Sequence, residues 1–307
     1  METRQIADED IDVFDSSSNE QPVDAEQPWV TLSASGMLTV EDADGLLRWR
    51  PVSIIAIVGE RNGGKTTLIT EIYQQFLRAP FAGHLFCHSL SLQGFERKCY
   101  QSRTISGNLY PDTPRTSVQE GLSFFHLAVS SQSVLQRTDL LIAERAGESY
   151  KKVRDNSSLA TDMLELCKAS TIVFIVDGEK VADFRQRGEV FASTRHLIRA
   201  LVETETISPV TQIQLVTTKW DLLEGDGAMG ARSALANFEK GLATAYPTIK
   251  VFHTAARDPS GHISPSTSLE PLFQSWLVKP LPAQAKPITI PPLRDEFDLL
   301  LLRRNAS

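Results

Sequence analysis

The sequence predicts a three-layer α/β domain with a mostly parallel sheet. From residue 53 to about 278, apolar runs of strand length alternate with segments of helical period. The first apolar run, 54–58, leads directly into a glycine-rich loop and then a helical segment. The neighbouring runs 122–129 and 138–143 are close enough in the chain to pair antiparallel. We therefore expect one antiparallel strand in an otherwise parallel sheet.

Two segments precede this domain. Residues 1–28 have the composition of a disordered arm, with nine acidic residues against one basic residue, Arg4. Composition favours a solubilising tail, and the alternative is a peptide that docks on a basic partner. Residues 29–52 contain short apolar runs separated by turn signals at 33–36 and 42–45. We expect a small N-terminal β-meander there, which covers an edge of the sheet.

Within the domain 53–278, apolar runs and helical periods define the remaining elements. The segment 81–121 is irregular, with a short apolar stretch at 84–86 and a possible helix at 95–100. Strands are expected at 54–58, 122–129, 138–143, 171–176, 213–217 and 249–253, and helices at 68–77, 156–168, 184–202, 231–243 and 269–277.

Residues 279–307 form a separate C-terminal segment in this prediction. Five prolines between 280 and 292 indicate an extended linker or surface strap. The apolar run 297–302 is too short to span a bilayer. We favour docking of this tail on its own domain over docking on a partner.

The composition limits the classes of function. The chain has 307 residues, 41% hydrophobic and 22% charged, which suits a globular protein with a sizeable core. A net charge of −7 argues against a broad basic surface for nucleic acid. No apolar run approaches the ~20 residues of a membrane span, and the acidic N-terminus is unlike a secretory signal. Cys87, Cys99 and Cys167 have no C-x-x-C spacing, so we expect a reducing, cytoplasmic setting.

The loop 59–67 carries the clearest chemistry, because it has the phosphate-binding pattern G-x-x-x-x-G-K-T between a strand and a helix. Glycines let the backbone curl so that successive N–H groups point at phosphate oxygens. Lys65 is expected to bind the β- and γ-phosphates, and the Thr66 hydroxyl to ligate Mg²⁺. The predicted phosphate-binding residues are Gly59, Asn62, Gly63, Gly64, Lys65, Thr66 and Thr67.

The end of the strand 213–217 indicates which base is bound. Residues 217–221 read T-T-K-W-D and match the pattern (N/T)-K-x-D. The Asp221 carboxylate can accept hydrogen bonds from the ring N–H and the exocyclic amine of guanine. Adenine lacks this pair of donors and forgoes a hydrogen bond worth ~1.5–3 kcal/mol, so we expect GTP over ATP. Lys219 can lie along the base plane, and Thr218 completes the predicted corner; the alternative is a capped helix start with a surface lysine.

Two further segments supply candidates. Ala255 and Ala256 follow the strand 249–253, where a backbone N–H would meet the guanine oxygen. The segment 111–116 lies between the first helix and the strand 122–129, and contains Thr113 and Thr116. We favour Thr116 as the residue that closes over Mg²⁺ and the γ-phosphate in a mobile switch, with an ordinary turn as the alternative.

The stretch after 138–143 departs from the expected D-x-x-G, because residues 144–148 read E-R-A-G-E. The Gly147 N–H can still bind the γ-phosphate, and Glu144 can still reach Mg²⁺ through water. Glu148 occupies the position of a water-orienting glutamine, and the γ-phosphate repels its charge unless Mg²⁺ or an arginine screens it. Hydrolysis is therefore expected to be slow or differently arranged. Arg115 and Arg145 are candidates for a charge-stabilising arginine, with surface arginines as the alternative.

The predicted catalytic residues are Lys65, Thr116, Gly147 and Glu148, and the predicted metal ligands are Thr66, Thr116 and Glu144.

The motifs G-E-R-N-G-G-K-T, T-K-W-D and E-R-A-G make the stretch from 53 to about 278 resemble P-loop GTPases of the translation-factor-related (TRAFAC) clade. The combination of G-G-K-T-T-L-I-T-E-I-Y, P-D-T-P-R-T and E-R-A-G-E is similar to the bacterial double-GTPase family. The resemblance implies a Ras-like P-loop fold. It also implies a bacterial cytosolic GTPase that acts with partner proteins, as in a conflict or defence system.

The function expected from the sequence is a molecular switch that binds GTP and GDP and hydrolyses GTP with Mg²⁺. The alternative is a nucleotide-binding scaffold with little turnover that recruits partner proteins, which Glu144 and Glu148 keep open. An ATPase is a third possibility, and Asp221 argues against it.

Overall fold

A computed structural model describes residues 36–101, 121–134, 136–257 and 264–278. Its contacts divide the chain into two units, 1–32 and 33–307, and every element below belongs to the second. The predicted acidic arm, the C-terminal segment 279–307 and the switch candidates Thr113, Arg115 and Thr116 lie outside the described residues.

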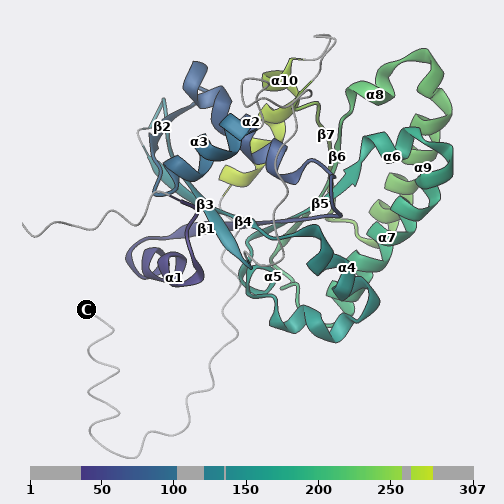
Figure 1. Ribbon diagram of the computed structural model, residues 1–307, viewed down its shortest axis with the longest axis horizontal. Coiled ribbons are helices and arrows are strands. Elements are labelled where there is room, and N and C mark those ends of the chain that lie inside the picture. The colour runs from purple at the N-terminus through teal and green to yellow at the C-terminus, as the bar shows by residue number, and fades with distance from the viewer. Residues whose placement is uncertain (1–35, 102–120, 135, 258–263, 279–307) are drawn as a thin grey trace, which may run out of the picture. The chain divides into compact units, whose positions relative to one another are not determined.

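A seven-stranded sheet forms the middle layer, with the order β2-β3-β4-β1-β5-β6-β7 (Figure 1). β3 pairs antiparallel with both β2 and β4, whereas the other pairings are parallel. This confirms the prediction of one antiparallel strand. The strands are β1 (Val52–Val58), β2 (His84–His88), β3 (Ser123–Ser131), β4 (Arg137–Glu144), β5 (Thr171–Asp177), β6 (Gln212–Thr218) and β7 (Lys250–His253).

Helices cover both faces of the sheet, as a three-layer α/β fold requires (Figure 1). The 3₁₀ turns η3 (Ser157–Asp162) and η4 (Asp226–Ala228) connect some of them. The helices are α1 (Val40–Trp49), α2 (Lys65–Arg78), α3 (Leu92–Gln101), α4 (Gly147–Asp155), α5 (Leu164–Lys168), α6 (Gly178–Ala182), α7 (Phe184–Glu203), α8 (Asp221–Glu224), α9 (Met229–Ala245) and α10 (Pro265–Leu277).

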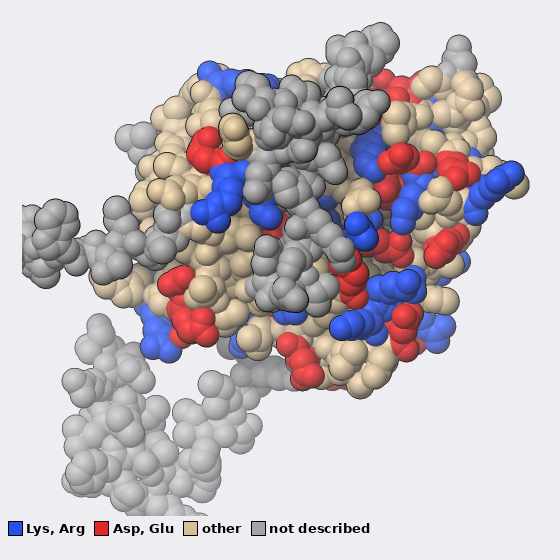
Figure 2. Space-filling model, viewed as in Figure 1, with Lys and Arg blue, Asp and Glu red and all other residues tan. Residues whose placement is uncertain are grey.

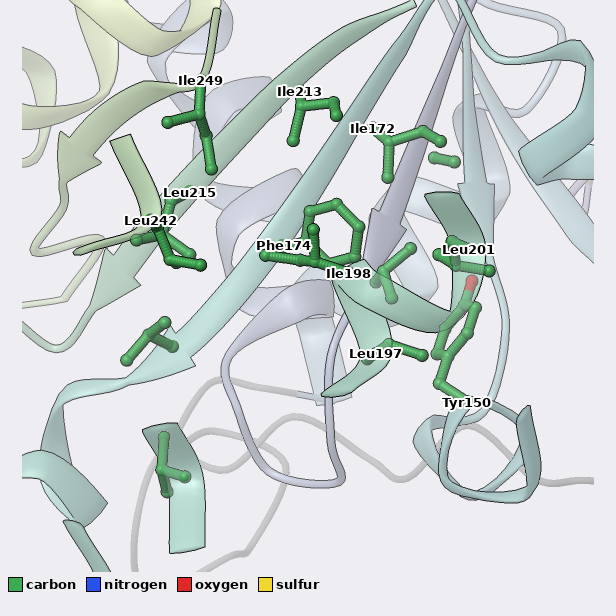
Figure 3. Packing of buried hydrophobic residues seen from close by; sticks show 14 of the residues in the cluster. Tyr150, Ile172, Phe174, Leu197, Ile198, Leu201, Ile213, Leu215, Leu242 and Ile249 are labelled. Carbon is green, nitrogen blue, oxygen red and sulfur yellow. The ribbon is translucent and has the colours of Figure 1, made fainter. Parts of the chain in front are cut away.

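The core has two halves, which lie on the two faces of the central strand β1. Ala56 and Val58 face a cluster built with α4, α5, α7 and α9, in which Phe174 and Leu215 also pack (Figure 3). The alternate residues Ile55 and Ile57 face the layer of α2, α3 and α10. Because both faces are buried, the strand is a continuous apolar run without polar alternation, as expected for a central parallel strand.

Helix α10 is attached to the sheet by a buried polar contact. The Gln214 amide on β6 donates to the Ser275 hydroxyl at 2.9 Å and accepts from the Trp276 indole N–H at 3.0 Å. Gln214 is fully buried, so these bonds satisfy groups that would otherwise be costly to bury. They hold α10 beside α2, the helix that follows the glycine-rich loop.

The predicted β-meander is wrong over its described part, because residues 40–49 form α1. Thr39 caps this helix: its hydroxyl accepts the Asp42 N–H at 3.2 Å, and the Asp42 carboxylate accepts the Thr39 N–H at 3.0 Å. The apparent turn signal at 42–45 therefore lies inside a helix. In the described part of this segment before β1, Leu38 pairs with the sheet through a bridge to Phe124.

The single helix predicted for 156–168 is also wrong. Helix α4 begins earlier, at Gly147, and ends at Asp155. The Asn156 side chain then accepts the Ser158 N–H at 3.2 Å and starts the 3₁₀ turn η3. Only 164–168 of the predicted span is α-helical.

None of the helices in the described residues is long and apolar enough to cross a membrane.

We predict that Thr39→Ala destabilises the protein by about 1 kcal/mol, because it removes the side-chain acceptor of the α1 cap. Thr39→Ser keeps that oxygen and is the matched control. Urea unfolding followed by circular dichroism measures the difference. Equal midpoints for the two variants would contradict a capping role for Thr39.

Candidate functional site

The predicted motifs meet at one edge of the sheet. The strands β1, β4, β5, β6 and β7 pair in parallel, so their carboxyl ends lie along the same edge. The loop 59–64 follows β1, and the stretch 144–148 begins at the last residue of β4. The corner 218–221 begins at the last residue of β6, and 254–256 follows β7. This is the edge at which α/β sheets bind ligands.

The loop after β1 has the curled backbone that its glycines predicted. Gly64 has a φ of 85° and immediately precedes α2, and Asn62 has a φ of 61°. Gly59 packs so closely on β5 that a Cβ there would lie 2.8 Å from the Ile175 Cβ. A side chain at position 59 would therefore push the loop off the sheet.

Lys65 reaches back across this loop. Its ammonium donates to the Gly59 carbonyl at 3.0 Å and to the Glu60 carbonyl at 2.8 Å. Burial lowers the pKa of Lys65, and the nearby carboxylates of Glu144, Glu148 and Glu60 oppose that shift. The lysine charge is thus held inside the curl of the loop, where phosphate oxygens would be bound.

The two described metal-ligand candidates touch each other. The Thr66 hydroxyl donates to the Glu144 carboxylate at 2.5 Å. Glu144 is 1% exposed and lies at the end of β4. A hydroxyl and a carboxylate oxygen are the hard donors that Mg²⁺ prefers. These residues therefore fit a magnesium ion, and the extra methylene of Glu144 does not prevent it from reaching Thr66.

Gly147 lies against the same loop. A Cβ at this position would be 2.5 Å from the Arg61 backbone nitrogen and 2.7 Å from the Glu60 carbonyl carbon. The residue also begins α4, so the helix starts where the backbone touches the loop. Glu148 follows in the first turn, close enough to act on the Lys65 charge.

The corner at the end of β6 touches the phosphate loop directly. The Thr218 hydroxyl donates to the Gly63 carbonyl at 2.8 Å. A Cβ on Gly64 would be 3.5 Å from the Thr218 Cβ. The loop and the corner, 155 residues apart in the chain, are therefore in contact.

Lys219 has an unusual backbone with a φ of 52°. Its ammonium contacts the carboxylates of Asp177 at 3.0 Å and Glu179 at 2.7 Å. Burial alone would lower the pKa of Lys219, but the hydrogen bond to Glu179 and the charge of Asp177 outweigh it, so the pKa is raised. The two acids hold the lysine stem in place beside the corner.

The loop after β7 contacts the corner 218–221 at the end of β6. The Thr254 carbonyl accepts the Trp220 N–H at 3.1 Å, and Asp221 follows as the first residue of α8. The Ala255 N–H already donates to the Ser268 hydroxyl at 3.2 Å. Of the two predicted alanines, Ala256 is therefore the better candidate for a base oxygen.

The sequence prediction missed a polar cluster around Glu60. The Glu60 carboxylate accepts from the Ser193 hydroxyl at 2.6 Å, the Lys180 ammonium at 2.9 Å and the Arg154 guanidinium at 3.4 Å. Burial would raise the pKa of Glu60, but these partners outweigh it and the pKa is lowered. No motif signals this cluster, because its members come from α4, α6 and α7.

A second missed residue is Gly178, which follows β5. A Cβ there would lie 2.2 Å from the Thr218 carbonyl oxygen and 2.8 Å from the Lys219 carbonyl oxygen. The dipeptide 177–178, at the end of a predicted buried strand, was the available signal. Position 178 must therefore lack a side chain for the corner to sit beside β5.

The candidate Arg145 forms an ion pair with Glu165. Its guanidinium makes a bidentate contact with Glu165 at 2.5 and 2.9 Å, and the Glu165 side chain is fully buried. Removing one partner of such a pair leaves a buried charge. Arg145 is thus a structural residue and is not free to turn toward a phosphate.

Charge on the described surface is mixed. On the face shown in Figure 2, acidic and basic side chains are interspersed, and neither sign covers a broad area.

Comparison with known proteins identifies the chain's relatives. A family model described as Double-GTPase 2 matches residues 53–277. No curated protein matches the chain.

Several solved structures resemble this fold at low sequence identity. The signal recognition particle receptor SRb-GTP/SRX complex from Chaetomium thermophilum has 12% identity and a TM-score of 0.42, over 74% of this chain and 97% of that chain. The Ski7 GTPase-like domain from S. cerevisiae, bound to GTP, has 14% identity and a TM-score of 0.41, over 78% and 53%. The elongation factor SelB from Methanococcus maripaludis has 12% identity and a TM-score of 0.39, over 74% of this chain and 34% of that chain. The chain thus spans about half of the Ski7 structure and a third of SelB.

We predict that Gly147→Ala weakens nucleoside triphosphate binding, because the new methyl group meets the backbone of the loop 59–61. Overpacking of this kind costs about 1–3 kcal/mol, or roughly 5- to 150-fold in affinity. Gly188→Ala, in the interior of α7, is the matched control, since a Cβ there meets nothing within 4 Å. Titration with a fluorescent triphosphate measures both. Equal affinities for the two variants would show that the close approach at 147 is unimportant for binding.

Proposed function

The chain belongs to the Double-GTPase 2 family, and from this we propose that it binds GTP, hydrolyses it to GDP and phosphate, and acts as a molecular switch. The observation that carries the proposal is the hydrogen bond of 2.8 Å between Thr218 and the Gly63 carbonyl. It joins the corner that would read the base to the loop that would bind the phosphates. One nucleotide can therefore contact both.

The base is selected by Asp221 in this proposal. Its carboxylate accepts from the ring N–H and the exocyclic amine of guanine, and Lys219 lies along the base plane. The support for a fixed lysine is its pair of contacts with Asp177 and Glu179. Ala256 offers its backbone N–H to the guanine oxygen.

The phosphates are held by the loop 59–67. Lys65 exchanges the Gly59 and Glu60 carbonyls for phosphate oxygens, and the loop N–H groups supply further donors. Thr66 and Glu144 would hold Mg²⁺, which neutralises charge on the β- and γ-phosphates when bound. Thr116, outside the described residues, is proposed to close over the γ-phosphate.

Hydrolysis needs little covalent chemistry from the protein. A water oxygen bonds to the γ-phosphorus as the bond from that phosphorus to the β–γ bridging oxygen breaks, and its electron pair stays on GDP. The water proton leaves with inorganic phosphate. Lys65 and the Gly147 N–H stabilise the charge that moves onto the phosphate oxygens.

A nucleotide-binding scaffold with little turnover is the second candidate. The supporting observation is Glu148, whose charge acts on Lys65 within the site where a neutral glutamine would orient water. In this case the protein would recruit partners in its GTP-bound form without hydrolysing GTP quickly.

The family also bears on the setting. We propose a cytoplasmic protein that works with partner proteins, in a bacterial conflict or defence system. The support is the resemblance of the three motifs, not any contact in the described residues.

We predict that Asp221→Ala weakens GTP binding by roughly tenfold or more, because the lost hydrogen bonds to a charged group contribute ~1.5–3 kcal/mol. ATP binding should not change. Asp221→Asn is the sharper variant: its amide can donate to xanthine, which has a carbonyl oxygen in place of the exocyclic amine of guanine. Isothermal titration with GTP, ATP and xanthosine triphosphate measures the preference. An equal loss for GTP and ATP would argue against base readout by Asp221.

We predict that Lys65→Ala slows single-turnover GTP hydrolysis by about 100-fold or more, since it removes a cation aimed at the transferred phosphoryl group. Lys240→Ala, which removes an exposed lysine from α9, should hydrolyse GTP at the wild-type rate. Phosphate release from a preloaded GTP complex measures the rate. If the wild type binds GTP but releases phosphate as slowly as Lys65→Ala, the protein is a nucleotide-binding scaffold and not a GTPase.

A further inference from the structure

Two aromatic rings lie against each other at the corner 218–221. The planes of the Trp220 and His253 rings are within 3° of parallel, and the ring centroids are 3.9 Å apart. Trp220 comes directly before Asp221, the residue proposed to read the base, and His253 is the last residue of β7 before the loop 254–256. The stack therefore joins two segments, from different strands, that are both proposed to contact guanine.

Backbone contacts bring the two rings together. Thr217 on β6 pairs with His253 on β7 in the sheet. The chain then passes through Lys219, which has a φ of 52°, and the Trp220 N–H donates to the Thr254 carbonyl at 3.1 Å. The ends of β6 and β7 are thus connected both by backbone bonds and by a contact between side chains.

Each ring of the stack also has an anchor of its own. The His253 Nε2 lies 2.8 Å from the Glu239 carboxylate on α9, and it is the donor because an ionised carboxylate can only accept. The Glu239 side chain is 15% exposed and the His253 side chain 34% exposed. Trp220 packs against the apolar cluster to which α7 and α9 contribute. The stack is therefore fixed to the helical layer as well as to the strand ends.

Packing of the core alone does not require this arrangement. An apolar side chain at position 253 would cover the Trp220 ring without placing a largely buried carboxylate beside it. Apolar contact is non-directional, whereas a parallel stack with a hydrogen bond from one ring fixes a single geometry. A fixed geometry is useful where groups from two strands must match one rigid purine.

We propose that Trp220, His253 and Glu239 are positioning residues that set the preference for guanine. The proposal rests on the proposed GTP-binding function and deepens it. Asp221 would accept from the ring N–H and the exocyclic amine, and Ala256 would donate to the guanine oxygen. Because the purine is rigid, both contacts form well only when the two segments keep one spacing, and the stack holds that spacing before the nucleotide binds.

The test compares base preference in variants of the full chain. His253→Ala removes the stack, and His253→Phe keeps a flat ring beside Trp220 without the bond to Glu239. His196→Ala, which removes an exposed histidine of α7, is the matched control. Affinities for GTP, ATP and inosine triphosphate are measured by titration, and thermal melts establish that each variant is folded. Inosine triphosphate has the ring N–H and the oxygen of guanine but lacks the exocyclic amine.

His253→Ala should bind GTP roughly 3- to 10-fold more weakly, as expected for loss of an aromatic pair, with ATP affinity within about twofold of wild type. The preference for GTP over inosine triphosphate should shrink, because Asp221 is no longer held against the amine. His253→Phe should recover part of the GTP affinity. Trp220→Ala should change the preference as much as His253→Ala, and the double variant no more than either, because the two rings act as one unit.

Three outcomes would overturn the inference while the proposed function stands. If His253→Ala keeps the wild-type preference for GTP over ATP, the stack has no part in base selection. If the affinities for GTP and ATP fall together, the stack supports only the fold. If His253→Phe binds GTP no better than His253→Ala, contact between the rings is not what holds the spacing. A wild-type protein that does not bind GTP would refute the proposed function and this inference with it.

Discussion

Close contact between backbones at one edge of the sheet is the constraint on which the rest of the structure depends. The Thr218 hydroxyl donates a hydrogen bond to the Gly63 carbonyl. Because Gly147 has no side chain, the chain that follows β4 can lie against the same loop. Gly178 leaves room for the Thr218 and Lys219 carbonyls beside β5. These contacts allow four separate strand ends to share one small site, and a single methyl group at position 147 or 178 would force them apart.

Charge around this edge is arranged in local pairs. Glu60 ties the loop to α4, α6 and α7 through Arg154, Lys180 and Ser193. Because its partners come from the helical layer, any movement of α4 away from the loop must break the contact with Arg154. The loop and α4 are thus linked twice, through the Glu60 cluster and through the backbone contact at Gly147. A switch between nucleotide states needs such a link between phosphate and helix.

The acid content of the site is its main departure from what the motifs alone suggest. Glu144 contacts Thr66 directly, so its greater length is accommodated in the fold. Glu148 lies in the first turn of α4, and its charge acts on Lys65. Arg145 is held by the buried Glu165.

The sequence by itself determined six of the seven strands, the order of the motifs and their assignment to strand ends, although it missed β2 (His84–His88), which it indicated only as a short apolar stretch in an irregular segment. This succeeded because buried parallel strands are uninterrupted apolar runs, and because a curled phosphate loop requires glycines at fixed spacing. It failed for 40–49, where Thr39 and Asp42 form a helix cap that looks like a turn signal, and for 156–168, where Asn156 ends one helix and starts another. Only the tertiary structure decided which charges are paired, as with Arg145 and Glu165 or Glu60 and Lys180, because such partners are 20 and 120 residues apart. Local pattern carries no information about contacts that exist only once the sheet has assembled.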